Sequence, residues 1–148
     1  MKALSVRNPW AAAIIHLGKD VENRTWTTQH RGRIAIHASL EPDRDAIIPI
    51  DTDPRIDADY FDCLRLDAGK IIGTVNLVSI HRDGECPVGC NVEWAFPETG
   101  PRPMFHWILR DPHPFETPWA HKGALQLWEP DVRSSGLIKA EEFAWLAR

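Results

Sequence analysis

The chain has 148 residues, which suits one domain large enough to bury a hydrophobic core. Hydrophobic residues make up 43% and charged residues 26%, as in ordinary globular proteins, and no apolar run approaches the roughly 18–20 residues that a membrane span requires. The formal net charge of −4 argues against a chain that binds nucleic acid through its overall charge.

The distribution of charge along the chain is uneven. Residues 1–39 contain six Lys or Arg and two acids, whereas residues 40–67 contain nine acids and three Arg. A local basic surface can bind phosphate while the whole molecule stays acidic. The alternative is that both segments are merely solvated surfaces, and charge alone favours that alternative.

The cysteines and the N-terminus indicate a reducing compartment. Cys63, Cys86 and Cys90 are too few, and odd in number, for a full disulfide framework, so reduced thiols are the simplest interpretation. The first residues lack the long apolar stretch of a secretion signal. We therefore expect a cytoplasmic protein with no membrane partner.

The chain begins with a strand and a short helix. Residues 2–6 are typical of a strand, and Asn8 and Pro9 then predict a helix start, with Asn8 as N-cap and Pro9 at the first helical position. The helix continues over 11–17, and Gly18 ends it as the residue that follows the C-cap.

The next segments alternate between strand and loop patterns. Residues 21–26 are expected to be extended, and residues 32–38 alternate with period two, which predicts a strand with one buried face. Residues 40–68 are rich in Asp and Pro, and a helix is expected over 54–66. We interpret 40–68 as an inserted helical and acidic segment within a single domain spanning 1–148.

The clearest strand covers residues 70–80, which are dense in β-branched side chains. Gly73 inside it indicates a bulge or a close backbone approach. Residues 82–102 are expected to form a long loop with a helical turn near 92–96, followed by a strand over 104–109.

The last third of the chain predicts a connection, a strand and a helix. Residues 112–122 are rich in proline and are expected to be a connection, 123–128 a strand and 137–147 a short helix. Five or six short strands with few helices indicate a mainly β sandwich or barrel of the α+β kind.

Several ordered motifs in this one chain carry a family resemblance. They are KALSVRNPWA at 2–11, GKDVENRTW at 18–26, GRIAIHAS at 32–39, IIGTV at 71–75, WILRDP at 107–112 and KGALQLW at 122–128. Together they resemble the ASCH-domain family, whose hallmark is similar to the Gly-x-Lys-x-x-Glu-x-Arg pattern that begins at Gly18. The resemblance spans about residues 2–130.

The resemblance implies a PUA-like mixed β-barrel of about five or six strands with flanking helices and a cleft near the first helix. Related folds bind RNA or modified bases. One bacterial branch is similar to an amidohydrolase that deacetylates N4-acetylcytidine, and another ASCH protein has ribonuclease activity. The family therefore defines the fold better than the reaction.

The charged residues of the hallmark are the main site candidates. In an extended segment Glu22 and Arg24 point to the same face, and a carboxylate beside a guanidinium prefers to stay ionised. The pair could orient a base edge or act on a water molecule, and Lys19 could meet a phosphate or take part in catalysis. The alternative is a structural ion pair at the end of the helix.

Aromatic and polar neighbours complete the expected ligand site. Trp10 and Trp26 could stack on a base. Ser5, Arg7 and Asn8 lie where the strand meets the helix start, whose free N–H groups would suit an anion. The remaining candidates share a strand face or a late Lys-Gly motif: His37, Ser39 and Lys122. Ordinary structural roles are the alternative for each.

A zinc site is the metal alternative. His81, Cys86 and Cys90 are separated by four and three residues, and Cys63 could be a fourth ligand. No Cys-x-x-Cys occurs and the loop is irregular, so we assign neither a metal nor another cofactor.

The leading hypothesis is a module that binds RNA or a modified nucleobase in a basic cleft. The alternative is a small, metal-independent hydrolase acting on N4-acylated cytidine or RNA. In the amidohydrolase branch Lys19 matches a family lysine, but Glu22 stands where a threonine is expected, so Glu22 would be a general base. A ribonuclease would use Lys19, Arg24 and His37. The sequence leaves open whether the protein is a monomer or a weak dimer.

Overall fold

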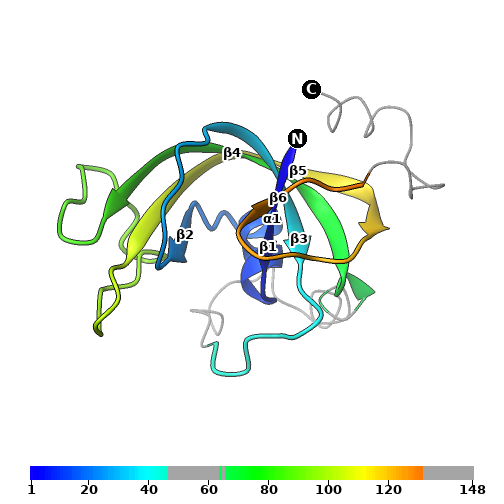
Figure 1. Ribbon diagram of the computed structural model, residues 1–148, viewed down its shortest axis with the longest axis horizontal. Helices are drawn as coiled ribbons and strands as arrows, with labels where there is room; N and C mark the ends of the chain where they lie inside the picture. Colours follow the sequence, from blue (N-terminus) through cyan, green and yellow to red (C-terminus); the bar gives the residue numbers. More distant parts are fainter. Residues whose placement is uncertain (47–63, 65, 132–148) are drawn as a thin grey trace.

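A computed structural model describes residues 1–46, 64 and 66–131 of the chain, and these residues form mostly strands (Figure 1). One sheet of six strands has the order β2-β5-β4-β3-β1-β6. The β1–β3 pair is parallel, and the other neighbours are antiparallel. The elements are β1 (Lys2–Val6), α1 (Trp10–His16), β2 (Val21–Arg24), β3 (Gly32–Ala38), β4 (Lys70–Arg82), β5 (Phe105–Ala120) and β6 (Leu127–Trp128).

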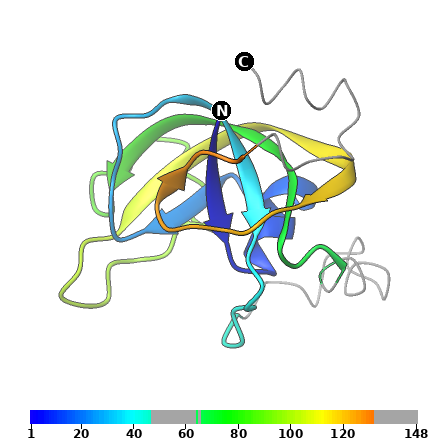
Figure 2. The same ribbon diagram turned by 45° about the vertical axis from the view of Figure 1, so that its right-hand side comes forward.

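The sheet curls into a half-barrel over α1. The long strands β4 and β5 form an arch above the helix in Figure 1, and Figure 2 shows β3, β1 and β6 side by side at one end of the sheet. Three register shifts along the β4–β5 pair bend these strands, because a bulge adds an unpaired residue and increases the local twist. The predicted mainly β, PUA-like barrel architecture is confirmed, with one helix in the described residues and an open side between β2 and β6.

The helix supplies the centre of the core. All but the last of the residues of α1 are buried, from Trp10 to Ile15, and they pack with the inward-facing residues of β1, β3, β4 and β5. Gly18 has a φ of +73° and ends the helix in the left-handed conformation, as its position predicted. Asn8 accepts a hydrogen bond from the Ala12 N–H at 3.3 Å, but the helix begins at Trp10 with Pro9 as its cap, slightly later than expected.

Gly73 lies where two backbones approach closely, as predicted. A Cβ atom at this position would lie 2.5 Å from the carbonyl oxygen of His113 on β5 and 3.0 Å from the side chain of Ile15 on α1. A register shift of the β4–β5 pair also falls between Ile71 and Gly73. The absence of a side chain at Gly73 therefore lets β4 and β5 pack closely on α1.

The predicted connection over 112–122 is wrong, because β5 continues to Ala120. Proline disrupts a strand mainly by removing a ladder hydrogen bond. The partner β2 covers only Phe105–Ile108 of β5, so the prolines that follow have no second described strand beside them whose pairing they would break. The strand expected over 123–128 is correspondingly shorter and covers only Leu127–Trp128.

Other parts of the chain agree with the sequence or lie outside the described residues. The turn expected near 92–96 is present, since the Ala95 N–H donates to the Asn91 carbonyl at 3.0 Å. The helix expected over 137–147, most of that over 54–66, and Cys63 lie outside the described residues. Among the residues that are described, no helix is long and apolar enough to cross a membrane.

Candidate functional site

A cleft of about 530 Å³ opens beside the start of α1, on the open side of the curled sheet. It is large enough for a small organic ligand, since such pockets measure roughly 300–1,000 Å³. Its walls come from the end of β1, the start of α1, β2, the connections on either side of α1, and the loops that follow β3, β4 and β5. The lining residues are Ser5, Val6, Arg7, Trp10, Lys19, Glu22, Asn23, Arg24, Ser39, Asp43, Phe96, Met104, Ala124, Leu125 and Gln126.

A row of three charges forms one wall of this cleft. Lys19 Nζ donates to Glu22 Oε2 at 2.8 Å and also to the Val21 carbonyl. Arg24 Nε lies 3.0 Å from the other carboxylate oxygen, Oε1, as an ion pair. Lys19 is 2% exposed and Glu22 is 7% exposed, so the row is set into the protein rather than spread over its surface.

The two cations keep Glu22 ionised. Burial alone would raise the pKa of this carboxyl, but the charges and hydrogen bonds of Lys19 and Arg24 outweigh it and hold the pKa below its ordinary value. Both carboxylate oxygens are therefore engaged by cations at neutral pH. The wall of the cleft therefore carries the N–H donors of Lys19 and Arg24 and the negative carboxylate of Glu22 in fixed positions. Such an arrangement can orient a polar ligand.

Arg24 also bridges the open side of the half-barrel. Its Nη2 donates to the Ser5 carbonyl at 2.8 Å, which joins edge strand β2 to β1 near the other end of the sheet. The Ser5 hydroxyl in turn accepts a hydrogen bond from Trp128 Nε1 on β6 at 3.1 Å. The Arg24 guanidinium therefore lies in the gap that the strands leave.

Aromatic side chains form a second wall. The rings of Trp10 and Phe96 meet edge to face at 5.6 Å, and Trp10 Nε1 donates to Asp43 Oδ2 at 2.8 Å. Lys19 Nζ lies 5.8 Å from the centre of the Trp10 ring, within the range of a cation–π contact. Phe96 is 40% exposed, so its ring is open to a stacking partner.

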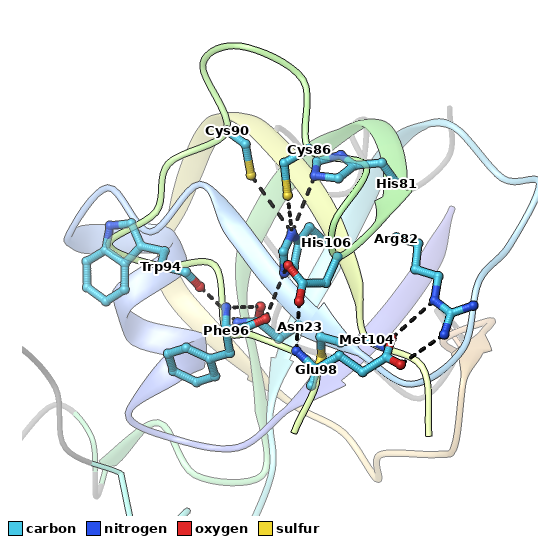
Figure 3. A network of polar contacts seen from close by, with 11 residues as sticks. Asn23, His81, Arg82, Cys86, Cys90, Trp94, Phe96, Glu98, Met104 and His106 are labelled. Atoms are coloured by element: carbon cyan, nitrogen blue, oxygen red, sulfur yellow. Dashed lines mark hydrogen bonds and ion pairs between the residues drawn. The ribbon is translucent and has the colours of Figure 1, made fainter. Parts of the chain in front are cut away.

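Asn23 holds this second wall in place. Its Oδ1 accepts a hydrogen bond from the Phe96 N–H at 2.8 Å, and its Nδ2 donates to the Trp94 carbonyl at 2.9 Å. Figure 3 shows this contact between β2 and the loop that carries Trp94 and Phe96. The strand that supplies the charged wall therefore also positions the aromatic wall.

The structure brings most of the residues predicted from the sequence into the cleft. They come from β1, α1, β2, the connections on either side of α1, and the segment after β3, and they are Ser5, Arg7, Trp10, Lys19, Glu22, Arg24 and Ser39. All seven residues lie within the first 39 residues of the chain but in several separate elements and connections. Their convergence is what the family motif implied for Lys19, Glu22 and Arg24.

Four predicted residues do not line the cleft. Asn8 is buried and donates to the Leu64 carbonyl at 3.0 Å. Trp26 packs against Trp107 with ring centres 4.7 Å apart. The other two lie near the β6 end of the sheet, where His37 is buried and bonded to the His121 carbonyl at 2.8 Å, and Lys122 is exposed.

Three amides near the start of α1 have acceptors within the protein, so the helix start offers fewer free amides for an anion than the sequence suggested. The N–H groups of Ala11, Ala12 and Ala13 donate to Arg7 O, Asn8 Oδ1 and Pro9 O, at 3.2, 3.3 and 2.9 Å. The cations placed to meet an anion in the cleft are the exposed Arg7 and the half-buried Arg24.

Several cleft residues were missed in the sequence. Asn23 lies inside the hallmark motif, and its position on β2 between Glu22 and Arg24 is the signal that would have found it. Val6 lies at the end of β1, and Ala124, Leu125 and Gln126 lie inside the KGALQLW motif, but neither pattern pointed to the cleft; Asp43, Phe96 and Met104 lie in loops without a motif. Their placement depends on long-range packing that no local pattern reports.

Comparison with known proteins places these features in context. The family model of the ASCH domain matches residues 4–116. The chain is 26% identical to human activating signal cointegrator 1 over 148 aligned positions, which cover 92% of this chain but only 24% of that protein. The chain therefore spans about a quarter of that relative.

Two solved structures have a similar fold. One is the ASCH protein of Zymomonas mobilis, with a TM-score of 0.56, 18% identity, and coverage of 99% of this chain and 92% of that chain. The other is a mutant of the same bacterial protein in which one tyrosine is replaced by phenylalanine, with a TM-score of 0.52, 17% identity, and coverage of 99% and 95%. At this level of identity the likeness shows the fold alone.

Proposed function

Because this chain belongs to the ASCH domain family, whose PUA-like fold is commonly associated with RNA binding, we propose that its cleft binds a nucleobase, presented by RNA or as a modified nucleoside. The observation that carries the proposal is the buried row of Lys19, Glu22 and Arg24 facing an open cleft with Trp10 and Phe96 on its second wall.

The two walls match the two parts of a nucleoside. A base has a π face, which suits the exposed ring of Phe96, and an edge of donors and acceptors, which suits the charged row. Lys19 has three N–H donors, of which Val21 and Glu22 use two. Arg7 and Arg24 are the cations available to a phosphate or ribose at the mouth.

A binding titration with matched variants tests this proposal. Cytidine, N4-acetylcytidine and a short single-stranded RNA are titrated into the protein and followed by calorimetry, with quenching of tryptophan fluorescence as a second readout. Arg24→Ala and Lys19→Met are expected to weaken binding about 10–100-fold, since a hydrogen bond to a charged group contributes roughly 1.5–3 kcal/mol. The control is Lys122→Ala, which removes an exposed cation outside the cleft.

Each outcome has a clear meaning. Weaker binding in both cleft variants with unchanged binding in the control supports the cleft. Equal binding by the wild type, Arg24→Ala and Lys19→Met would mean that the ligand binds outside the cleft. Circular dichroism of each variant separates a lost contact from a lost fold.

Hydrolysis is the second candidate function, and the adjacent Lys19 and Glu22 in the cleft are the observation that favours it. It ranks lower because cations engage both Glu22 oxygens and hold its pKa low, which weakens a general base. The ribonuclease version loses support, because His37 does not line the cleft with Lys19 and Arg24. The test is release of acetate from N4-acetylcytidine in the presence of a chelator. If acetate is released and Glu22→Gln abolishes the release, metal-independent hydrolysis rather than binding alone is the function of the cleft.

A further inference from the structure

A cluster of two histidines and two cysteines lies outside the cleft, where the loop between β4 and β5 folds back on the sheet. His81 is near the end of β4 and His106 near the start of β5, and the two face each other as register partners. Cys86 and Cys90 come from the loop. One donor atom from each residue lies within 4.8 Å of all the others, and Figure 3 shows them pointing toward one centre.

Hydrogen bonding alone does not account for this convergence. His106 Nε2 lies 2.8 Å from the Phe96 carbonyl and must carry a proton to donate to it, so in the neutral ring Nδ1 has one lone pair. Three groups approach that lone pair: His81 Nε2 at 3.3 Å, Cys86 Sγ at 3.3 Å and Cys90 Sγ at 3.9 Å. One lone pair accepts one hydrogen bond, whereas one metal ion takes all four donors.

The separations match a tetrahedral ion with bonds of about 2.0–2.1 Å to nitrogen and about 2.3 Å to sulfur, because those bonds imply N···N edges near 3.3 Å and N···S edges near 3.5 Å. The observed nitrogen pair is 3.3 Å apart, and the two nitrogen–sulfur contacts, at 3.3 and 3.9 Å, lie on either side of the expected value. These three separations therefore fit a coordination shell, and the other donor pairs lie within 4.8 Å of one another.

The donor set selects the kind of metal. Thiolate and imidazole suit zinc and disfavour the oxygen-binding ions magnesium and calcium. Four protein ligands leave no open position, which is typical of a structural rather than a catalytic site. The hydrogen bond from His106 to the Phe96 carbonyl is the outer support that a metal-binding histidine needs, since it fixes the ring and its tautomer.

We propose that His81, Cys86, Cys90 and His106 form a structural zinc site that fastens the β4–β5 loop to the sheet. The sequence alone suggested three of these residues with Cys63 as the fourth ligand, and its lack of a Cys-x-x-Cys and its irregular loop left the metal unassigned. The structure supplies the fourth donor from β5, sixteen residues after Cys90 and on a different element.

The site has a direct mechanical link to the rest of the molecule. The zinc ligand His106 holds the Phe96 carbonyl, and Asn23 on β2 holds the Phe96 N–H. At the far side of the loop Arg82 pairs with both carboxylate oxygens of Glu98, at 2.9 and 3.1 Å. Loss of the ion is expected to loosen the loop between these anchors, which includes the backbone of Phe96.

Metal analysis of the full chain, purified under reducing conditions, tests the proposal. We expect one zinc ion per chain by elemental analysis. After removal of zinc, we expect Co²⁺ to give the intense visible bands of tetrahedral coordination together with a thiolate-to-cobalt charge-transfer band. Cys86→Ser and His81→Ala are expected to weaken Zn²⁺ binding at least about 100-fold, beyond the 10–100-fold typical of outer-shell changes.

Two choices keep the test decisive. Cys86 is exposed, so Cys86→Ser is expected to leave the metal-free fold intact by circular dichroism, even where a change at the buried His106 would not. Cys63→Ser is the matched control and should keep full binding. The site is overturned if the reduced, folded protein takes up neither Zn²⁺ nor Co²⁺, or if Cys63→Ser abolishes uptake and Cys86→Ser does not.

Discussion

Glu22 shows how one side chain serves both stability and a candidate site. It is buried between a lysine and an arginine, and removing one member of such a group leaves the others as buried charges without full compensation. The same contacts fix the donors that line the cleft. The residue is therefore expected to matter for folding even where no ligand is present.

Glu22→Gln is expected to destabilise the protein by roughly 3–5 kcal/mol at pH 7, because Lys19 stays buried without its counter-charge. Urea denaturation measures this change. Glu129→Gln removes the carboxylate of a solvent-exposed pair with Lys2 and is the control, for which little change is expected. Equal stability of Glu22→Gln and the wild type would show that the buried row contributes nothing net.

The pH dependence of this effect follows from the direction of the pKa shift. Because the pKa of Glu22 is lower in the folded state than its ordinary value of 4.5, its stabilisation is fully present above that value. It is lost as the pH falls through the folded-state pKa. Burial raises the pKa of Asp67, which acts in the opposite direction, so the difference between wild type and Glu22→Gln is the quantity to follow.

At the residue scale the sequence predicted what a short motif contains. Lys19, Glu22 and Arg24 lie within six residues, and strand alternation brings Glu22 and Arg24 to one face. His37 was placed with Ser39 by the same alternation, but β3 ends at Ala38, so Ser39 lies beyond the strand and lines the cleft while His37 stays buried within the strand. Alternation shows which residues share a face, but not where the strand ends or what covers that face, so the position of His37 could not be predicted.

At the scale of elements the arch of β4 and β5 decides the shape of the molecule. The crossing at Gly73 is the tightest point, with His113 and Pro114 of β5 on one side and Ile15 of α1 on the other. The sequence predicted this close approach from a glycine inside a β-branched strand. It did not predict the length of β5, because prolines are compatible with a strand only where one edge lacks a partner.

Gly73→Ala is expected to destabilise the fold by about 1–3 kcal/mol, as is typical of overpacking, since the added carbon meets backbone atoms that cannot rotate away. Thermal and urea denaturation measure the effect. Gly100→Ala is the matched control, because a Cβ there meets nothing within 4 Å, and it should change stability by less than about 0.5 kcal/mol. Equal effects of the two substitutions would contradict the crossing geometry.

At the scale of the whole molecule the net charge of −4 limits how RNA is held. In the described residues, Arg7 and Arg24 are the cleft cations placed near its open mouth. Only a few phosphates are then neutralised, and most of the affinity must come from the base. The sequence showed that the N-terminal third is basic. It did not show how few of these cations reach the cleft, because that number depends on the fold.

Binding of single-stranded RNA is therefore expected to depend weakly on salt. With two phosphates neutralised, the slope of log K against log salt concentration should be about −1.4, since each phosphate on a single strand contributes roughly −0.7. A nucleoside without phosphate should give a slope near zero. A slope of about −4 or steeper for RNA would mean that the backbone is bound along an extended surface instead.

The bond between Arg24 and the Ser5 carbonyl has one further consequence. A ligand that takes this guanidinium for itself releases the only described side-chain tie across the unpaired edges of the sheet at that point. Ligand binding and local opening between β2 and β1 then become linked equilibria. Tight binding favours a slightly wider opening of the cleft. Hydrogen exchange at the amides of β2 is where this linkage would be read, faster in the occupied protein than in the free one.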